Sequence, residues 1–167
     1  MKQTVSSIEN KWIGRVNSLL LPTAVTGLLL PMTAVAEVLT CNALDFPADP
    51  SSPWLYGWIT WREQSIPLIS WESITGGEAP ALKSNSGPVA VINAIGPAAH
   101  LGFIGLRLEH FPRPVHVEDK DLLDSTGTEA QEAGVLMRAS LDGVPAVVPE
   151  LSLIERCCAG LAPPATV

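Results

Sequence analysis

Basic side chains are scarce in this sequence of 167 residues. Lysine and arginine number 10 against 17 aspartates and glutamates, which gives a formal net charge of -7, and no stretch gathers the basic residues into a stripe. A phosphate backbone would repel such a chain, so binding to nucleic acid is disfavoured. By contrast, 47% of the residues are hydrophobic, enough to bury the core of one compact domain or of two small barrels sharing a seam.

Cysteine and histidine occur only three times each. Cys41 stands alone and Cys157 is followed directly by Cys158, an odd number without C-x-x-C spacing. This pattern argues against a disulfide framework and against a zinc site, and we expect reduced, partly buried thiols. The histidines lie in separate segments without carboxylates at metal-ligand spacing, so no metal site is expected. They are His100, His110 and His116.

Catalytic signatures are missing as well. The sequence contains neither the G-x-S-x-G motif of a serine nucleophile nor a Cys-His signature, and no G-K-[ST] follows Gly102 and Gly105. The acidic stretch from Glu118 to Asp124 lacks the alternating spacing and central glycine of a calcium loop. We therefore expect no enzymatic activity and no cofactor.

The N-terminal apolar run, residues 19–36, allows two interpretations. Basic residues precede it, and Ala34-Val35-Ala36 resembles the cleavage site of a secretory signal. One alternative is therefore an exported β-rich protein that begins at Glu37. However, Pro22, Pro31 and the break at Thr26-Gly27 suit two short strands joined by a turn, and they interrupt the roughly 20 apolar residues that a membrane span needs. We favour the strands, and with them a cytoplasmic protein without direct membrane insertion.

The pattern of the whole chain predicts a mainly β protein. Residues 1–15 are expected to form a loosely ordered arm, residues 16–158 the folded domain and residues 159–167 a tail. Short apolar runs alternate with turn residues at intervals of roughly ten residues, as in a small barrel or sandwich. We expect strands at 19–24, 28–31, 54–62, 65–70, 89–95, 101–108, 115–117, 135–141 and 144–148. Between them we expect a brief helix after Thr33, a linker at 41–53, an exposed loop at 124–134 and a terminal helix opened by Pro149.

Two hairpins stand out in this pattern. Asp142-Gly143, between two apolar strands, is the strongest turn signal in the chain. The other hairpin is rich in tryptophan: its strands, Trp54–Arg62 and Ser65–Ser70, are expected to turn at Glu63-Gln64. Pro67 cannot donate a ladder hydrogen bond and places the second strand at a sheet edge or a bulge.

The first strand of the tryptophan hairpin suits a docking surface. Side chains alternate along a strand, so Trp58 and Arg62 share one face while Trp61 lies on the other. Arginine and tryptophan are enriched at binding hot spots because each combines a large contact area with a directional donor. Alternatives remain open at this point: Arg62 can simply end a strand in solvent, at least one tryptophan can fill the core, and Glu37 can lie on the solvated side of the short helix.

The order of these elements, from about Val16 to Glu155, resembles the CheW-like family. Three segments carry the resemblance. Leu28-Leu29-Leu30-Pro31 with Ala34-Val35-Ala36-Glu37-Val38-Leu39 is similar to the second strand and following short helix of the family. Pro53-Trp54-Leu55-Tyr56-Gly57-Trp58-Ile59-Thr60-Trp61-Arg62 with Ile66-Pro67-Leu68-Ile69 is similar to its central signature, and Leu141-Asp142-Gly143 to its closing hairpin.

The resemblance implies a mainly β fold of two intertwined five-stranded SH3-like barrels with short helices. It implies a non-catalytic adaptor of chemotaxis signal transduction that binds the regulatory domain of a CheA-like histidine kinase and the cytoplasmic tip of a methyl-accepting chemoreceptor. The strand-end arginine of the family maps to Arg62, its opening glycine to Gly57 and its short-helix glutamate to Glu37. With Trp58 and Trp61, these residues form the predicted partner-binding site.

Some positions depart from the family pattern. Glu63 replaces the glycine that usually follows the arginine, Ser70 replaces the aspartate after the apolar-Pro-apolar strand, and Pro149 stands at the corresponding position of the closing hairpin. The segment is also unusually rich in tryptophan. These departures make the chain resemble the ChpC and PilI proteins of type IV pilus chemosensory systems, which control twitching motility, more than the flagellar form.

Overall fold

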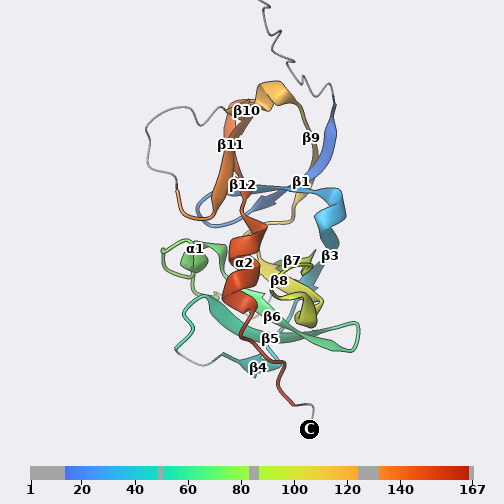
Figure 1. Cartoon of the computed structure of the whole chain (residues 1–167), viewed down its shortest axis with the longest axis vertical. Coiled ribbons are helices and arrows are strands. Elements are labelled where there is room, and N and C mark those ends of the chain that lie inside the picture. Colours follow the sequence, from blue (N-terminus) through green and yellow to red (C-terminus); the bar gives the residue numbers. More distant parts are fainter. Residues whose placement is uncertain (1–13, 49–50, 83–86, 124–131, 166–167) are drawn as a thin grey trace, which may run out of the picture.

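The described residues form two β-sheet lobes stacked along the long axis of the molecule (Figure 1). The structure is a computed structural model, and it describes residues 14–48, 51–82, 87–123 and 132–165. Its strands are β1 (Val16–Pro22), β2 (Gly27–Pro31), β3 (Val35–Cys41), β4 (Phe46–Pro47), β5 (Leu55–Trp61), β6 (Gln64–Ile69), β7 (Gly87–Asn93), β8 (Phe103–Arg107), β9 (Arg113–Val117), β10 (Leu122–Leu123), β11 (Val135–Leu141) and β12 (Val144–Pro149). Its helices are α1 (Trp71–Ile74) and α2 (Leu151–Cys158), with single 3-10 turns at η1 (Met32–Ala34), η2 (Ala99–Leu101) and η3 (Asp119–Asp121).

The terminal lobe combines strands from the two ends of the folded chain, whereas the strands of the middle lobe, β3 to β8, are consecutive. The sheet of the terminal lobe has the order β10-β11-β12-β2-β1-β9, and the sheet of the middle lobe has the order β3-β7-β8-β6-β5-β4. The chain crosses into the middle lobe after β2 and returns to the terminal lobe after β8. Each sheet consists of five longer strands and one strand of two residues, β10 or β4. The predicted pair of intertwined five-stranded barrels is thus confirmed, with one short strand added to each.

The two lobes repeat one structural unit that residue identities conceal. The hairpin β5-β6 and the helix α1 have their counterparts 80 residues further along in β11-β12 and the first turn of α2. Both hairpins carry a register shift at the same place, between Leu55 and Gly57 and between Val135 and Met137. In each lobe the hairpin pairs in parallel with a strand of another hairpin, β6 with β8 and β12 with β2. The first unit runs from β1 to α1 and the second from β7 to α2. The first hairpin of each unit, β1-β2 or β7-β8, lies in the sheet formed by the remaining strands of the other unit.

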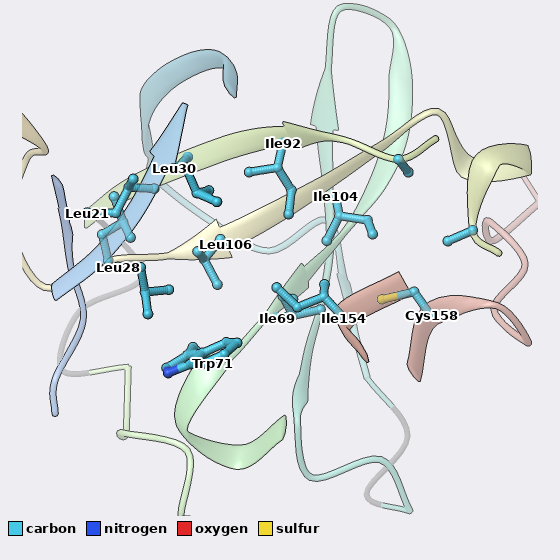
Figure 2. Close-up of a cluster of buried hydrophobic side chains, with 14 of the residues drawn as sticks. Leu21, Leu28, Leu30, Ile69, Trp71, Ile92, Ile104, Leu106, Ile154 and Cys158 are labelled. Atoms are coloured by element: carbon cyan, nitrogen blue, oxygen red, sulfur yellow. The ribbon is translucent and has the colours of Figure 1, made fainter. Parts of the chain in front are cut away.

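The largest core lies between the lobes, beside α2 (Figure 2). Leucines of β1 and β2 meet isoleucine and leucine side chains of β7 and β8 there, while Trp71, Ile154 and Cys158 come from the two helices. Each lobe also has a cluster of its own. The middle lobe contains Cys41, Ile59, Trp61, Ile66, Leu68, Val89 and Val91, and the terminal lobe contains Leu20, Leu29, Val117, Ala139, Leu141 and Ala146.

The strands expected in the N-terminal apolar run are confirmed. β1 and β2 pair antiparallel, with Leu20 opposite Leu29, and Leu21 and Leu28 are completely buried between the lobes. A chain beginning at Glu37 would lose both strands and at least four buried leucines, each worth about 2 kcal/mol of burial. The fold therefore argues against the export alternative. No helix among the described residues is long and apolar enough to cross a membrane, and most of the expected arm, residues 1–13, lies outside them.

The helix expected after Thr33 is wrong. The chain makes only the single turn η1 and then continues as β3, which pairs with β7. β-branched side chains at Val35 and Val38 favour extended backbone, and β7 supplies a partner along the whole segment. Glu37 consequently lies on an end strand of the middle sheet and not on a short helix.

The tryptophan hairpin forms, but two of its expected details are wrong. The turn lies at Arg62-Glu63, and Gln64 already pairs with Trp61. β6 is not an edge strand, because it lies between β5 and β8, although the hairpin does contain an irregularity of register, between Leu55 and Gly57. Pro67 is tolerated there because the parallel ladder with β8 is formed by the next two residues, Leu68 and Ile69.

The C-terminal elements differ from expectation by a few residues. The hairpin at Asp142-Gly143 is confirmed, but Pro149 ends β12, and α2 begins at Leu151 with Glu150 as its N-cap residue. The expected linker at 41–53 contains the two-residue strand β4. Most of the expected loop at 124–134 lies outside the described residues.

Two buried carboxylates join the lobes. Glu72 of α1 accepts a hydrogen bond from the backbone N–H of Ala24, at the tip of the β1-β2 hairpin, over 2.7 Å. Glu155 of α2 accepts hydrogen bonds from three backbone N–H groups of the β7-β8 connection, at 3.2, 2.6 and 3.2 Å. Both glutamates are only 5% exposed. Each helix thus fixes the hairpin tip of the opposite lobe by charge-assisted hydrogen bonds.

Candidate functional site

Three of the predicted site residues meet at the tip of the tryptophan hairpin. Trp61 ends β5, Arg62 begins the turn and Glu37 lies in β3. Oε2 of Glu37 accepts a hydrogen bond from Nε1 of Trp61 at 3.0 Å and from Nη2 of Arg62 at 2.9 Å. Because β3 begins the order of the middle sheet and β5 lies near its other end, this carboxylate joins the two sides of the sheet.

The Arg62 guanidinium is held over an aromatic pair. Its central carbon lies 4.7 Å from the ring centroid of Trp61, and Phe103 of β8 packs edge-on against the same ring, with centroids 4.6 Å apart. The side chains of Arg62 and Glu37 remain 68% and 39% exposed. An ion pair this exposed adds at most about 1 kcal/mol to stability. The arrangement instead presents a cation at the surface in a defined position.

The other two predicted site residues lie inside the protein. Trp58 is buried in the core between the lobes, whereas Trp61 is buried in the cluster of the middle lobe. Gly57 is buried at the register shift of β5 and has a φ of 150°, a conformation that side-chain-bearing residues rarely adopt. The expectation that at least one tryptophan fills the core is correct for both. Only Glu37 and Arg62 of the five predicted residues offer substantial polar surface to a partner.

Two further residues, which no sequence pattern indicated, shape this site. Phe103 supports Trp61 from β8, but nothing in its sequence neighbourhood connects it to the hairpin. Asp45 donates its backbone N–H to the carbonyl of Trp58, and its carboxylate accepts the backbone N–H of Thr60. This carboxylate occupies a donor on the open edge of β5 and so limits pairing with another strand. The proline-rich segment around Asp45 had indicated only a linker.

The hairpin turn itself is strained. Arg62 and Glu63 have φ values of 46° and 64°, a left-handed conformation that costs about 1–2 kcal/mol for each residue with a side chain. The corresponding turn of the terminal lobe, Asp142-Gly143, has φ values of 50° and 82° with the residue types that this turn favours.

A hollow of about 340 Å³ opens in the terminal lobe against α1. Trp71, Val135 and Val147 contribute to an apolar lining, and Glu132 and Arg138 form an ion pair of 3.0 Å beside it. Among the described residues, no group of three or more histidine, cysteine, aspartate or glutamate side chains is placed to hold a metal ion.

The cysteines are free thiols, as expected. Cys41 and Cys158 are buried, and Cys157 is partly buried. Burial, together with the negative charges of the neighbouring Cys157 and Glu155, raises the pKa of the Cys158 thiol to about 12. A thiol with so high a pKa carries almost no thiolate at neutral pH and is a poor nucleophile.

Comparison with known proteins relates this fold and this site to a family. The sequence model of the CheW-like domain matches residues 20–155. Among solved structures, the chain is similar to the scaffolding protein TtCheW from Thermoanaerobacter tengcongensis, with a TM-score of 0.63 and 16% identity, covering 81% of this chain and 89% of that chain. At this identity the likeness shows the fold alone. No curated protein sequence matches the chain.

Proposed function

Because the chain belongs to the CheW-like family, we propose that it is a non-catalytic adaptor in chemotaxis signalling. In this role it couples a CheA-type histidine kinase to chemoreceptors in the cytoplasm. It binds the regulatory domain of the kinase through one surface and the cytoplasmic tip of a methyl-accepting receptor through another. The family match over most of the chain and the paired barrels support this assignment.

We further propose that the chain belongs to the ChpC and PilI branch, which acts on type IV pilus twitching motility. The departures at Ser70 and Pro149 and the tryptophans of the central segment support this branch. In the structure these departures have local roles: Ser70 accepts a hydrogen bond from the N–H of Ser73 at the start of α1, and Pro149 ends β12.

The main support for a partner-binding site is the cluster of Glu37, Trp61 and Arg62. A partner that contacts Arg62 meets a guanidinium already fixed by an ion pair and by the Trp61 ring. A side chain held in place loses less conformational entropy on binding than a free one, so the same contact contributes more affinity. Buried Gly57 and Trp58 act from inside, by setting the path of β5 and its packing between the lobes.

The direct test is binding to the kinase regulatory domain. We expect the purified protein to bind that fragment, measured by calorimetry, and Arg62→Glu to lower the affinity about 30-fold, equivalent to ~2 kcal/mol for a hot-spot residue. Arg138→Glu is the matched control, because Arg138 is also an exposed arginine, 55% accessible, in a 3.0 Å ion pair, but lies on the terminal lobe.

Two results would count against the proposal in different ways. Wild-type affinity for both kinase and receptor fragments after Arg62→Glu would remove Arg62 from the binding surface. Failure of the unmodified protein to bind either fragment would contradict the adaptor function itself. The unfolding temperature of each variant should stay within a few degrees of the wild type, because both ion pairs are exposed.

A further inference from the structure

Glu63 occupies a conformation that its residue type does not favour. Within the described part of the chain, three residues other than glycine have a positive φ: Arg62, Glu63 and Asp142. All three lie at the centre of two-residue hairpin turns, in which both central residues need positive φ, and for which Asn or Asp followed by Gly is the favoured pair. Asp142 is the first residue of such a favoured pair. The counterpart of Glu63, 80 residues further along, is Gly143, which adopts the same conformation without a side-chain clash.

Internal contacts explain the strain at Arg62 but not at Glu63. The Arg62 side chain pairs with Glu37 and lies over Trp61, so its position in the turn is used within the protein. Glu63 is exposed and makes no hydrogen bond or ion pair with any residue that the structure describes. Glycine at this position would relieve the strain without any loss of contacts. No contact within the described part of the chain therefore accounts for a glutamate at this position, and its exposed carboxylate is accessible to another molecule.

The charges around Glu63 indicate which kind of group on another molecule could contact its carboxylate. The ion pair between Arg62 and Glu37, 2.9 Å long, balances those two charges. The carboxylate of Glu63 then remains without a cationic partner among the described residues, in a chain whose net charge is already negative. A group that gains by contacting it must be positive, because a second carboxylate or a phosphate would be repelled.

We propose that Glu63 is a specificity-determining contact residue, whose carboxylate pairs with a lysine or arginine side chain on the regulatory domain of the kinase. This assignment rests on the adaptor function proposed above. Glu63 selects the partner by its charge, while the adjacent Arg62 and Trp61 supply the contact area. Strain of this kind persists at binding sites where the side chain is needed for recognition.

Two substitutions separate recognition from strain. Glu63→Gln keeps the side-chain length and the turn but removes the charge, and we expect about tenfold weaker binding to the kinase regulatory domain with an unchanged unfolding temperature. The remaining binding should also depend less on salt, because one screened charge pair is lost. Glu63→Gly should weaken binding similarly and raise the unfolding temperature by roughly 3 °C, since the strain disappears. Asp142→Asn is the control, because it removes a charge from the equivalent turn of the terminal lobe and should leave the affinity unchanged.

The outcomes distinguish this assignment from the adaptor function. If the wild type binds the kinase domain and Glu63→Gln binds within twofold of it, the contact role of Glu63 is refuted and the adaptor function stands. An increase in unfolding temperature for Glu63→Gly without any loss of affinity refutes it in the same way. If the wild type itself does not bind the kinase domain, the proposed function and this assignment fail together.

Discussion

Removal of the Glu155 carboxylate should destabilise the whole protein. This side chain is 5% exposed and accepts three backbone hydrogen bonds, from Ile95, Gly96 and Ala98. Hydrogen bonds to a charged group contribute about 1.5–3 kcal/mol each, and buried donors left without an acceptor add a desolvation cost. One carboxylate serves all three donors, and in the variant water can bind some of the N–H groups that lose their acceptor. We therefore expect Glu155→Ala to lower the free energy of unfolding by about 4 kcal/mol.

The size of this effect makes it easy to measure. Native stability is typically about 5–15 kcal/mol, so a loss of ~4 kcal/mol should lower the unfolding temperature by roughly 12 °C and move the urea midpoint clearly. Glu155→Gln keeps one acceptor oxygen but turns an amide donor toward the N–H groups, and we expect about 2 kcal/mol. Glu150→Gln, at the N-cap of the same helix and partly exposed, is the control, with less than about 1 kcal/mol expected. A cost below 1 kcal/mol for Glu155→Ala would refute the assignment of Glu155 as a link between the lobes.

Three further predictions concern the interior. Gly57→Ala should cost about 1–3 kcal/mol in urea unfolding, because alanine is strained at a φ of 150°; an unchanged midpoint would contradict the backbone conformation. Trp71→Ala should cost about 3–5 kcal/mol and shift the transitions of both lobes together, since Trp71 is 2% exposed in the core they share; separate transitions by fluorescence and circular dichroism would contradict this. The Cys158 thiol, with its pKa raised to about 12 by burial, stays protonated in the folded state above pH 9, where the unfolded thiol ionises. The free energy of unfolding should therefore fall with rising pH between about 9 and 12, by up to ~1.4 kcal/mol per unit, and Cys158→Ala should lack this component.

Most of the strands could be predicted from the sequence, but β3, β4 and β10 could not, nor could the strands that each one pairs with. Alternating apolar residues and the Asp142-Gly143 turn predicted the hairpins, because those signals are local. The segment after Thr33 was wrongly assigned to a helix, since its spacing of apolar residues fits both periods and only pairing with β7 decides between them. Pro67 indicated an edge strand or a bulge. The edge position was wrong, because the residue at which the ladder with β8 starts is set by tertiary structure and not by local sequence.

The residues of the candidate site could be identified from the sequence, but their contacts with one another could not. Alternation correctly placed Trp58 and Trp61 on opposite faces of β5, yet both are buried, because one face packs between the lobes and the other fills the middle lobe. The hydrogen bonds of Glu37 to Trp61 and Arg62 join residues that are 24 and 25 positions apart. Such contacts arise from the order of strands in the sheet, which local sequence patterns do not specify.

The exchange of hairpins between the lobes makes the folding of either lobe depend on both halves of the chain. A fragment ending at Leu82 would hold β1 and β2 without the strands they pair with in β9 and β12, and would hold β3 without β7. Neither half can complete a sheet alone, but two complementary halves mixed together have every partner they need. The protein should therefore tolerate a cut peptide bond between its two units far better than the loss of either unit, a property that suits it to split-reporter studies of its assembly in cells.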